Sequence, residues 1–201
     1  MSGFTFANTI EKVPYEGKIP HEFSIKASPS TDIWAKPPST LRFNAPILYK
    51  CIPLTAFKRA RVAITAHWKS TYDQGGLILV INGADGGQKW IKTGIEFTHD
   101  KPHVSTVAKD MWADWSLFPV PTGGPAATIE MVREQDNSLW IYLMEGVQRS
   151  PIREVTWAFE DEKTQDCWIG TYAAKPSKED GDLIVDFRHL VVDVDSGEDS
   201  S

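Results

Sequence analysis

The sequence predicts an all-β fold in which two antiparallel sheets pack face to face. Few windows of a dozen residues avoid Gly, Pro or clusters of β-branched and aromatic residues, so helical periodicity is hard to find. Short runs rich in Val, Ile, Thr, Trp, Tyr and Phe alternate with turn segments. Strands that lack intervening helices cannot form a parallel sheet with crossover helices, and their apolar faces must therefore be buried by another sheet or by closure into a barrel. A two-sheet sandwich follows.

The predicted strands follow one another along the whole chain. They cover residues 41–44, 47–52, 61–68, 76–81, 89–97, 103–108, 127–134, 138–144, 153–159, 167–173 and 182–194. Turn segments separate them, among them PTGGP at 121–125 and KEDG at 178–181, whose Gly, Asn or Asp residues tolerate the positive φ of hairpins. This spacing indicates antiparallel pairing.

Two of these runs alternate with period two, which assigns their side chains to faces. We expect the apolar set to point into the core: Ile91, Ile95, Phe97, Leu139, Ile141 and Leu143. The opposite set is polar or aromatic: Trp90, Lys92, Gly94, Glu96, Trp140 and Tyr142. Adjacent polar and aromatic faces would form a lined groove.

Such a groove suits a sugar or a small polar metabolite, because rings stack on apolar faces while fixed donors and acceptors bind hydroxyl groups. The candidate groove residues are Tyr72, Asp73, Gln74, Trp90, Lys92, Glu96, Asp114, Trp115, Trp140 and Tyr142. In the alternative interpretation, Trp90 and Trp140 only cover a sheet face, and Lys92 and Glu96 form an ion pair.

The charge distribution argues against nucleic acid or a membrane surface as a partner. The formal net charge is -6, and Asp193, Asp195, Glu198 and Asp199 supply four of these charges within the last nine residues. The body is therefore nearly neutral and has no basic face for phosphate groups. We expect one domain over residues 1–195 and a disordered acidic tail over 196–201.

Cysteine content and the absence of a signal-like start predict a soluble cytoplasmic protein. Cys51 and Cys167 are too far apart in sequence for a CxxC pair and too few for a disulfide-built domain. We predict no metal, because Pro102 interrupts the helix that would align His99 and His103. No cofactor motif is present, and a glycosidase would need Asp73 or Asp114 beside Glu96.

Four motifs resemble one known family in order and spacing, from about residue 40 to residue 190. They are WKSTYDQGGL (68–77), WIKTGIEF (90–97), DWS (114–116) and GTYAAKP (170–176). The chain resembles the concanavalin A-like domain family that includes the fungal regulation-of-enolase proteins. It departs from the family pattern at Ala113, where Ser is more usual.

This resemblance implies a jelly-roll sandwich without established catalytic activity. It also implies a cytoplasmic protein that modulates carbohydrate metabolism through a partner, enolase or another cytosolic metabolic enzyme. The leading hypothesis is thus a non-enzymatic regulator. The competing hypothesis is a carbohydrate-binding or small-metabolite-binding module, with glycoside cleavage as an option, and the third is a purely structural sandwich.

Overall fold

The computed structural model describes residues 3–13, 18–82, 87–160 and 165–195. Its elements are β1 (Thr5–Ala7), β2 (Glu22–Ala27), β3 (Ile33–Lys36), β4 (Thr40–Phe43), β5 (Ile47–Pro53), the 3-10 turn η1 (Leu54–Ala56), β6 (Phe57–Ala66), β7 (Gln74–Asn82), β8 (Gln88–Thr98), β9 (Lys101–Lys109), β10 (Ala113–Pro119), β11 (Ala126–Arg133), β12 (Leu139–Glu145), β13 (Gln148–Val155), β14 (Asp166–Ala174) and β15 (Leu183–Val194). No helix in this part of the chain is long and apolar enough to cross a membrane. The acidic tail predicted at 196–201 lies outside the described residues.

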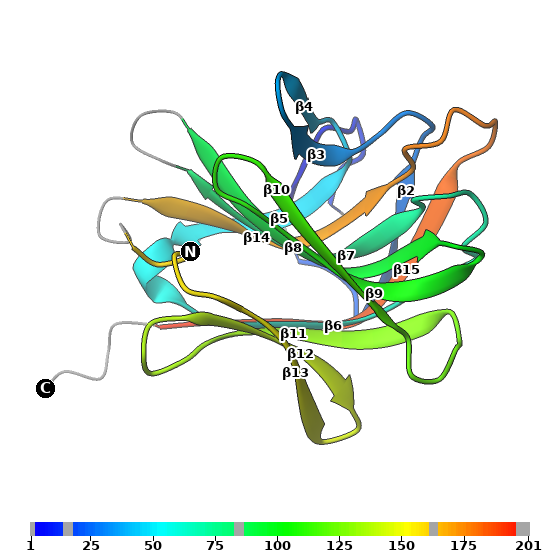
Figure 1. The fold of residues 1–201 in the computed structure, drawn as a ribbon. Coiled ribbons are helices and arrows are strands. Elements are labelled where there is room, and N and C mark those ends of the chain that lie inside the picture. The colour runs from blue at the N-terminus through cyan, green and yellow to red at the C-terminus, as the bar shows by residue number, and fades with distance from the viewer. Residues whose placement is uncertain (1–2, 14–17, 83–86, 161–164, 196–201) are drawn as a thin grey trace, which may run out of the picture.

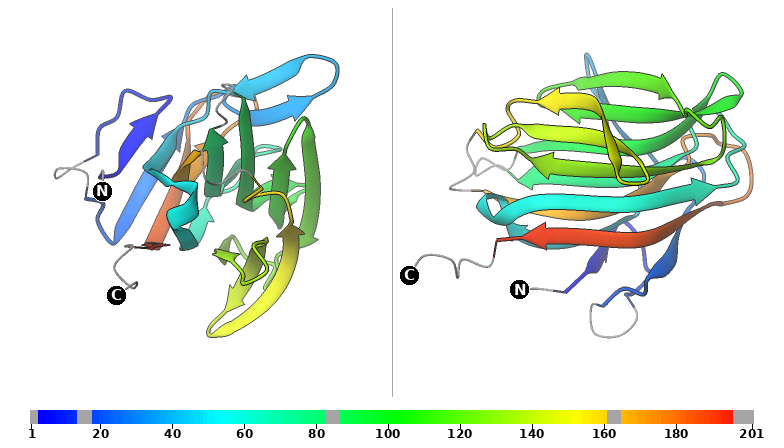
Figure 2. Two further views of the ribbon diagram at one scale, coloured as in Figure 1. Left: turned by 90° about the vertical axis from the view of Figure 1, so that its left-hand side faces the viewer. Right: turned by 90° about the horizontal axis from the view of Figure 1, so that it is seen from below.

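The strands form two large antiparallel sheets, which confirms the predicted all-β sandwich (Figure 1). One sheet has seven strands in the order β1-β5-β14-β7-β8-β9-β10, and the other has six in the order β13-β12-β11-β6-β15-β2. Figure 2 shows the two layers from the side and the six-stranded sheet from below. The separate β3–β4 hairpin extends beyond these layers.

The main core lies between the two sheets, where both contribute alternate residues. Ile91, Ile95, Leu139, Ile141 and Leu143 are buried there as predicted, and Phe97 packs against the same core. Removing these aliphatic side chains from water is the main term that holds the sheets together. Their alternating neighbours must therefore point away from the core, to the outer faces of the sandwich.

A second apolar cluster covers part of the outer face of the seven-stranded sheet. Ile33 and Ala35 of β3 pack there with Ile78 of β7, Trp90 of β8 and Tyr172 of β14. The β3–β4 hairpin is thus anchored on this sheet by its own alternating apolar residues. Trp34 and Lys36, which alternate with these residues, lie on the other face of the hairpin and border the space between the hairpin and the sheet.

The sequence-based prediction misplaced one strand and missed four. Residues 153–159 were predicted as one strand, but β13 ends at Val155 and a turn follows. Ala158 and Phe159 are buried in the main core from that turn, so their apolar character does not require a strand. The prediction also missed β1, β2, β3 and β10.

Candidate functional site

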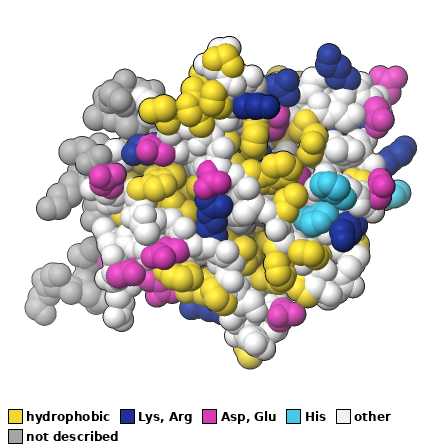
Figure 3. All heavy atoms as spheres, viewed as in Figure 1, with side chains coloured by type: hydrophobic (Ala, Val, Ile, Leu, Met, Phe, Trp, Pro, Cys, Tyr) yellow, Lys and Arg dark blue, Asp and Glu magenta, His cyan; other side chains and the backbone are white. Residues whose placement is uncertain are grey.

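A pocket of about 460 Å³ lies between the outer face of the seven-stranded sheet and the β3–β4 hairpin. This volume is within the usual range of small-molecule sites. The sheet side contributes Tyr72, Gln74, Lys92, Glu96 and Trp115, and the hairpin side contributes Asp32, Trp34, Lys36, Thr40 and Arg42, with Pro176 at the edge. Figure 3 shows apolar and basic side chains together over this hairpin, at the top of the view.

Strand β8 brings two charged side chains into the pocket. Lys92 and Glu96 lie four positions apart and so share one face of the strand, opposite to Ile91 and Ile95. Between them lies Gly94, where a Cβ would be 2.1 Å from the carbonyl oxygen of Gly75. Only glycine allows this close approach, and it leaves the space between the two charged groups free of a side chain.

The ammonium group of Lys92 is fixed by an amide on the neighbouring strand. Lys92 Nζ donates to Gln74 Oε1 at 2.5 Å, and the Tyr172 hydroxyl donates to the same oxygen at 3.4 Å. Gln74 Nε2 in turn donates to the Tyr72 carbonyl oxygen at 3.2 Å. Burial lowers the pKa of Lys92, and the negative charges of Glu96 and Asp32 oppose that shift.

The carboxylate of Glu96 is held by two side chains from the next strands. Ser105 Oγ donates to Glu96 Oε2 at 2.7 Å, and Trp115 Nε1 donates to Ser105 Oγ at 3.0 Å. Burial raises the pKa of Glu96, while the Lys92 charge and the Ser105 hydrogen bond lower it. Glu96 is 5% exposed, and this buried carboxylate can therefore accept hydrogen bonds in a site with little competing water.

Three aromatic rings stand at steep angles to one another around the pocket. The ring centroids of Trp34 and Trp115 are 6.0 Å apart with an interplanar angle of 83°, and those of Tyr72 and Trp115 are 6.1 Å apart at 73°. Tyr72 has a φ of 72°, a left-handed conformation that is uncommon for a bulky residue. Tyr72 is 44% exposed, so it is available to a ligand.

The hairpin residues of the pocket were missed by the sequence analysis. Residues 27–40 are rich in Pro and Ser and were not predicted to contain a strand. The signal was nevertheless present, because Ile33 and Ala35 alternate with Trp34 and Lys36, and the first pair is buried. Asp32 at the start of the hairpin lies 3.5 Å from Arg42.

Five of the ten predicted groove residues line this pocket. They are Tyr72, Gln74, Lys92, Glu96 and Trp115. Trp90 shares their face of the sheet but is 3% exposed and packs in the outer apolar cluster, 5.8 Å from Lys92 Nζ. It therefore supports the pocket from below and does not line it.

Asp73 and Asp114 lie outside the pocket for different reasons. Asp73 Oδ2 accepts from the backbone N–H groups of Lys69 and Ser70, at 3.1 and 2.9 Å, so its carboxylate caps the turn before β7. Asp114 alternates with Trp115 on β10 and so points to the opposite side, where it pairs with Arg153 of β13. That ion pair bridges the edges of the two sheets.

Trp140 and Tyr142 lie on the other sheet, away from the pocket. They alternate with Leu139, Ile141 and Leu143, which point into the main core, and therefore face outward from the six-stranded sheet. The prediction that they join the same groove was wrong, because period-two alternation shows which face a residue occupies but not which sheet carries it.

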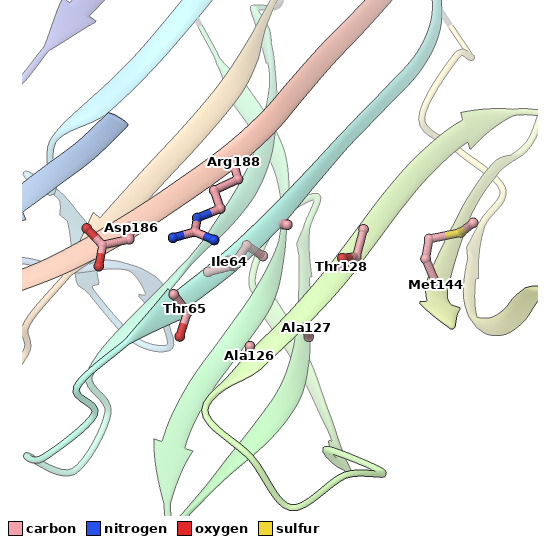
Figure 4. A pocket seen from close by; sticks show the side chains of 9 residues that line it. Ile64, Thr65, Ala126, Ala127, Thr128, Met144, Asp186 and Arg188 are labelled. Atoms are coloured by element: carbon pink, nitrogen blue, oxygen red, sulfur yellow. The ribbon is translucent and has the colours of Figure 1, made fainter. Parts of the chain in front are cut away.

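A second hollow lies on that outer face of the six-stranded sheet (Figure 4). Short side chains line most of it, including Thr65, Ala126 and Thr128. Its two charged residues already have partners: Asp186 accepts from Ser24 Oγ at 2.6 Å, and Arg188 lies 3.6 Å from Glu22. Among the described residues, no group of three or more His, Cys, Asp or Glu side chains could hold a metal ion.

Sequence comparisons match this chain to a family model and to a relative, neither of which has an assigned function. The chain matches the family model described as "Protein of unknown function (DUF1349)" over residues 11–193. An uncharacterized protein of Emericella nidulans is 66% identical over 194 residues, which are 96% of this chain and 97% of that protein. Neither description names an enolase regulator.

Solved structures show the same fold at low identity. A functionally unknown protein from Saccharomyces cerevisiae has a TM-score of 0.76 at 21% identity, covering 96% of this chain and 97% of that chain. An immunostimulatory antigen and pseudo beta-1,3-glucanase of Mycobacterium tuberculosis has a TM-score of 0.56 at 10% identity, covering 96% and 92%. The predicted concanavalin A-like jelly-roll architecture is thus confirmed as a fold, and fold alone does not assign an activity.

Proposed function

We propose that this chain, which belongs to the DUF1349 family of proteins of unknown function, binds a small sugar-like ligand in the pocket beneath the β3–β4 hairpin. The observation that carries the proposal is the combination of aromatic walls and a buried polar floor. Trp34, Tyr72 and Trp115 offer ring faces, while Lys92 and Glu96 offer a donor and an acceptor. Sugars need both, because their C–H faces stack on rings and their hydroxyl groups hydrogen-bond.

Binding without cleavage is the form of this function that the pocket supports best. Its two carboxylates are Asp32 and Glu96, and Asp32 is engaged with Arg42 and with the backbone N–H of Ile33 at 2.8 Å. A hydrolase needs one carboxyl group as acid and a second as nucleophile or base. Since Asp32 is tied into the hairpin, it is suited to holding the pocket wall.

Glycoside cleavage is the second candidate, and one observation favours it. Burial raises the pKa of Glu96, as is required of a general acid at neutral pH. An aryl-glycoside panel separates the two candidates. Binding without turnover supports the first, whereas turnover that disappears in Glu96→Gln establishes the second.

The binding function can be tested with two variants, each of which replaces one tryptophan by alanine. Titration calorimetry with a panel of neutral and acidic monosaccharides should detect a ligand of the wild-type protein. Trp115→Ala should weaken its affinity at least about tenfold, because stacked aromatic contacts contribute strongly to sugar-sized ligands. Trp140→Ala is the matched control, since it removes a half-buried tryptophan from the other sheet and should leave affinity unchanged.

Two outcomes would reject the binding function. One is that no monosaccharide in the panel binds to the wild type. The other is that Trp115→Ala and Trp140→Ala weaken binding equally, which would mean that the effect comes through general stability. Thermal melting of both variants, measured beside the titrations, identifies such a loss.

The regulatory partnership with enolase or another cytosolic metabolic enzyme, and the cytoplasmic location, stay predictions from the family resemblance. The pocket supports this idea in one respect, because a bound metabolite would give a regulator something to sense. Pull-down from cytosol with the full chain and with a version ending at Asp195, which keeps all of β15, tests it. Recovery of a metabolic enzyme by both versions supports a surface separate from the acidic tail, and recovery by neither contradicts the partnership.

A further inference from the structure

We propose that the ligand of this pocket carries one acidic group, a carboxylate or a phosphate monoester, and that Lys92 binds it. The inference rests on the sugar-binding function proposed above and narrows its ligand to sugar acids or sugar phosphates. It depends on the hydrogen bonding of Lys92, on the charges around the pocket and on the separation of Lys92 from Glu96.

Lys92 has an unusual shortage of partners for a buried ammonium group. It is 2% exposed, yet across the described part of the chain its Nζ has a single hydrogen-bond acceptor, Gln74, and no carboxylate within ion-pair distance. The ammonium also lies 5.6 Å from the Tyr172 ring centroid and 5.8 Å from that of Trp90, but these rings supply no anion. An ammonium group has three donors, so two remain for a ligand. A buried cation without an anion is unfavourable, and an acidic ligand would supply the missing charge.

The buried carboxylate Glu130, on the outer face of the other sheet, shows how the same chain satisfies a charge that only stabilises structure. Glu130 lies between two arginines, with Arg149 Nε 2.7 Å from Oε2 and Arg59 3.3 Å from Oε1. Among the described residues, Lys92 has no oppositely charged group within ion-pair distance, and Glu96 acts on it only from farther away. From this contrast we infer that a bound ligand supplies the negative charge that pairs with Lys92.

The charges around the pocket leave an excess of one positive charge. Lys36, Arg42 and Lys92 line it against Asp32 and Glu96. Arg42 and Asp32 pair with each other at 3.5 Å, which leaves two lysines and one carboxylate. A ligand with one negative charge would match this formal excess. Lys36 and Arg42 are exposed, so the charge that gains most from such a ligand is the buried Lys92.

The separation of Lys92 and Glu96 on β8 sets the orientation of this ligand. Gln74 pairs with Glu96 across β7 and β8, and the Lys92 ammonium reaches the Gln74 side chain. Because Glu96 would repel an acidic group, that group lies on the side of the ammonium that faces away from Glu96. Hydroxyl groups of the same ligand then donate to Glu96, between the rings of Tyr72 and Trp115 that adjoin it. One end of the pocket thus recognises charge and the other recognises hydroxyl groups.

The experiment compares sugars that share a ring but differ in one group. Titration calorimetry would use glucose, glucuronate and glucose 6-phosphate, with the matching galactose series. We expect wild-type protein to bind one of the acidic members at least about tenfold more tightly than its neutral parent. Comparison of the affinities for glucuronate and for glucose 6-phosphate shows whether the pocket prefers a carboxylate or a phosphate.

Variants then assign the preference to Lys92. Lys92→Met should bring the ratio of acidic-sugar to neutral-sugar affinity close to one, even where loss of this donor weakens both, whereas Lys26→Met, on the outer face of the other sheet, should leave the ratio unchanged. If Lys92→Met fails to fold, Glu96→Gln gives an opposite test, because loss of its negative charge should raise the ratio of acidic-sugar to neutral-sugar affinity.

The outcomes separate this inference from the function on which it rests. Equal affinity for acidic and neutral sugars, or a preference that survives Lys92→Met, overturns the role of Lys92 but leaves sugar binding intact. A ratio that does not rise in Glu96→Gln also counts against it. Absence of binding by every sugar in both series overturns the proposed function as well.

Discussion

The two outer faces of the sandwich have similar side chains but differ in what covers them. On the seven-stranded sheet, Lys92 and Glu96 lie under the β3–β4 hairpin and beside aromatic rings, within a pocket. On the six-stranded sheet, Trp140 and Tyr142 stack with ring centroids 6.1 Å apart, and Arg149 lies 5.4 Å from the Tyr142 ring. In the described part of the chain no hairpin lies above these rings, and the buried Glu130 of this face is paired with Arg59 and Arg149 of the same sheet.

The comparison shows that alternation of aromatic and charged residues does not by itself make a binding site. Both faces arise from the same period-two pattern. On the open face, Arg59 contacts both Glu130 and Asp193, and the Tyr142 hydroxyl donates to Glu134 at 2.9 Å, so the polar groups stabilise the sheet. On the covered face, the hairpin adds a wall to the pocket, and its charged residues Asp32 and Arg42 pair with each other.

The largest effect that we predict concerns the strand pairing beneath the pocket. Gly94→Ala should lower the free energy of unfolding by about 2–4 kcal/mol, because its Cβ would collide with the backbone of Gly75 in the middle of the sheet. Urea denaturation measures the change. The control is Thr128→Ala on the open face, which should cost less than about 1 kcal/mol. Similar losses in both variants would mean that the covered face has no special backbone requirement.

An intermediate effect is expected for the buried carboxylate of the open face. Glu130→Gln should lower the free energy of unfolding by about 1–3 kcal/mol, because two arginines lose the anion that they share. Since Arg59 and Arg149 are partly exposed, water compensates for part of the loss. Chemical denaturation at low and high salt checks this, and an unchanged stability would contradict a structural role for this network.

The smallest effect should come from the matching substitution on the covered face. Glu96→Gln should stay within about 1 kcal/mol of wild type at neutral pH, because the glutamine oxygen can still accept the Ser105 hydrogen bond and no ion-pair contact of Glu96 is described. Its folded-state pKa is raised by burial, so ionisation of this group costs wild-type stability as pH rises from about 4.3, the usual value for Glu, through the folded pKa.

This linkage gives the pH dependence a definite sign. The stability of Glu96→Gln relative to wild type should increase as pH rises through that range, since glutamine does not ionise. Thermal melting from pH 4 to pH 7 measures the difference, with Glu130→Gln as the comparison. A difference that shrinks with rising pH would contradict the raised pKa of Glu96.

The sequence alone determined the fold class and the faces of the strands. Residues such as Ile91, Ile95 and Leu139 could be assigned to the core because side-chain direction in a strand alternates with a period of two, which is a local property. The same rule placed Lys92 and Glu96 together on one outer face. The motif residues Tyr72, Gln74 and Trp115 also indicated the correct region of the chain.

Only the tertiary structure decided which of these residues meet. Asp114 and Trp115 are neighbours in sequence, yet one bridges the sheet edges and the other lines the pocket. Trp140 has the pattern of a groove residue but lies on the other sheet, and Asp32 and Trp34 reach the pocket from a hairpin that the sequence analysis missed. Sheet order and hairpin docking depend on contacts between residues far apart in sequence, which local alternation does not encode.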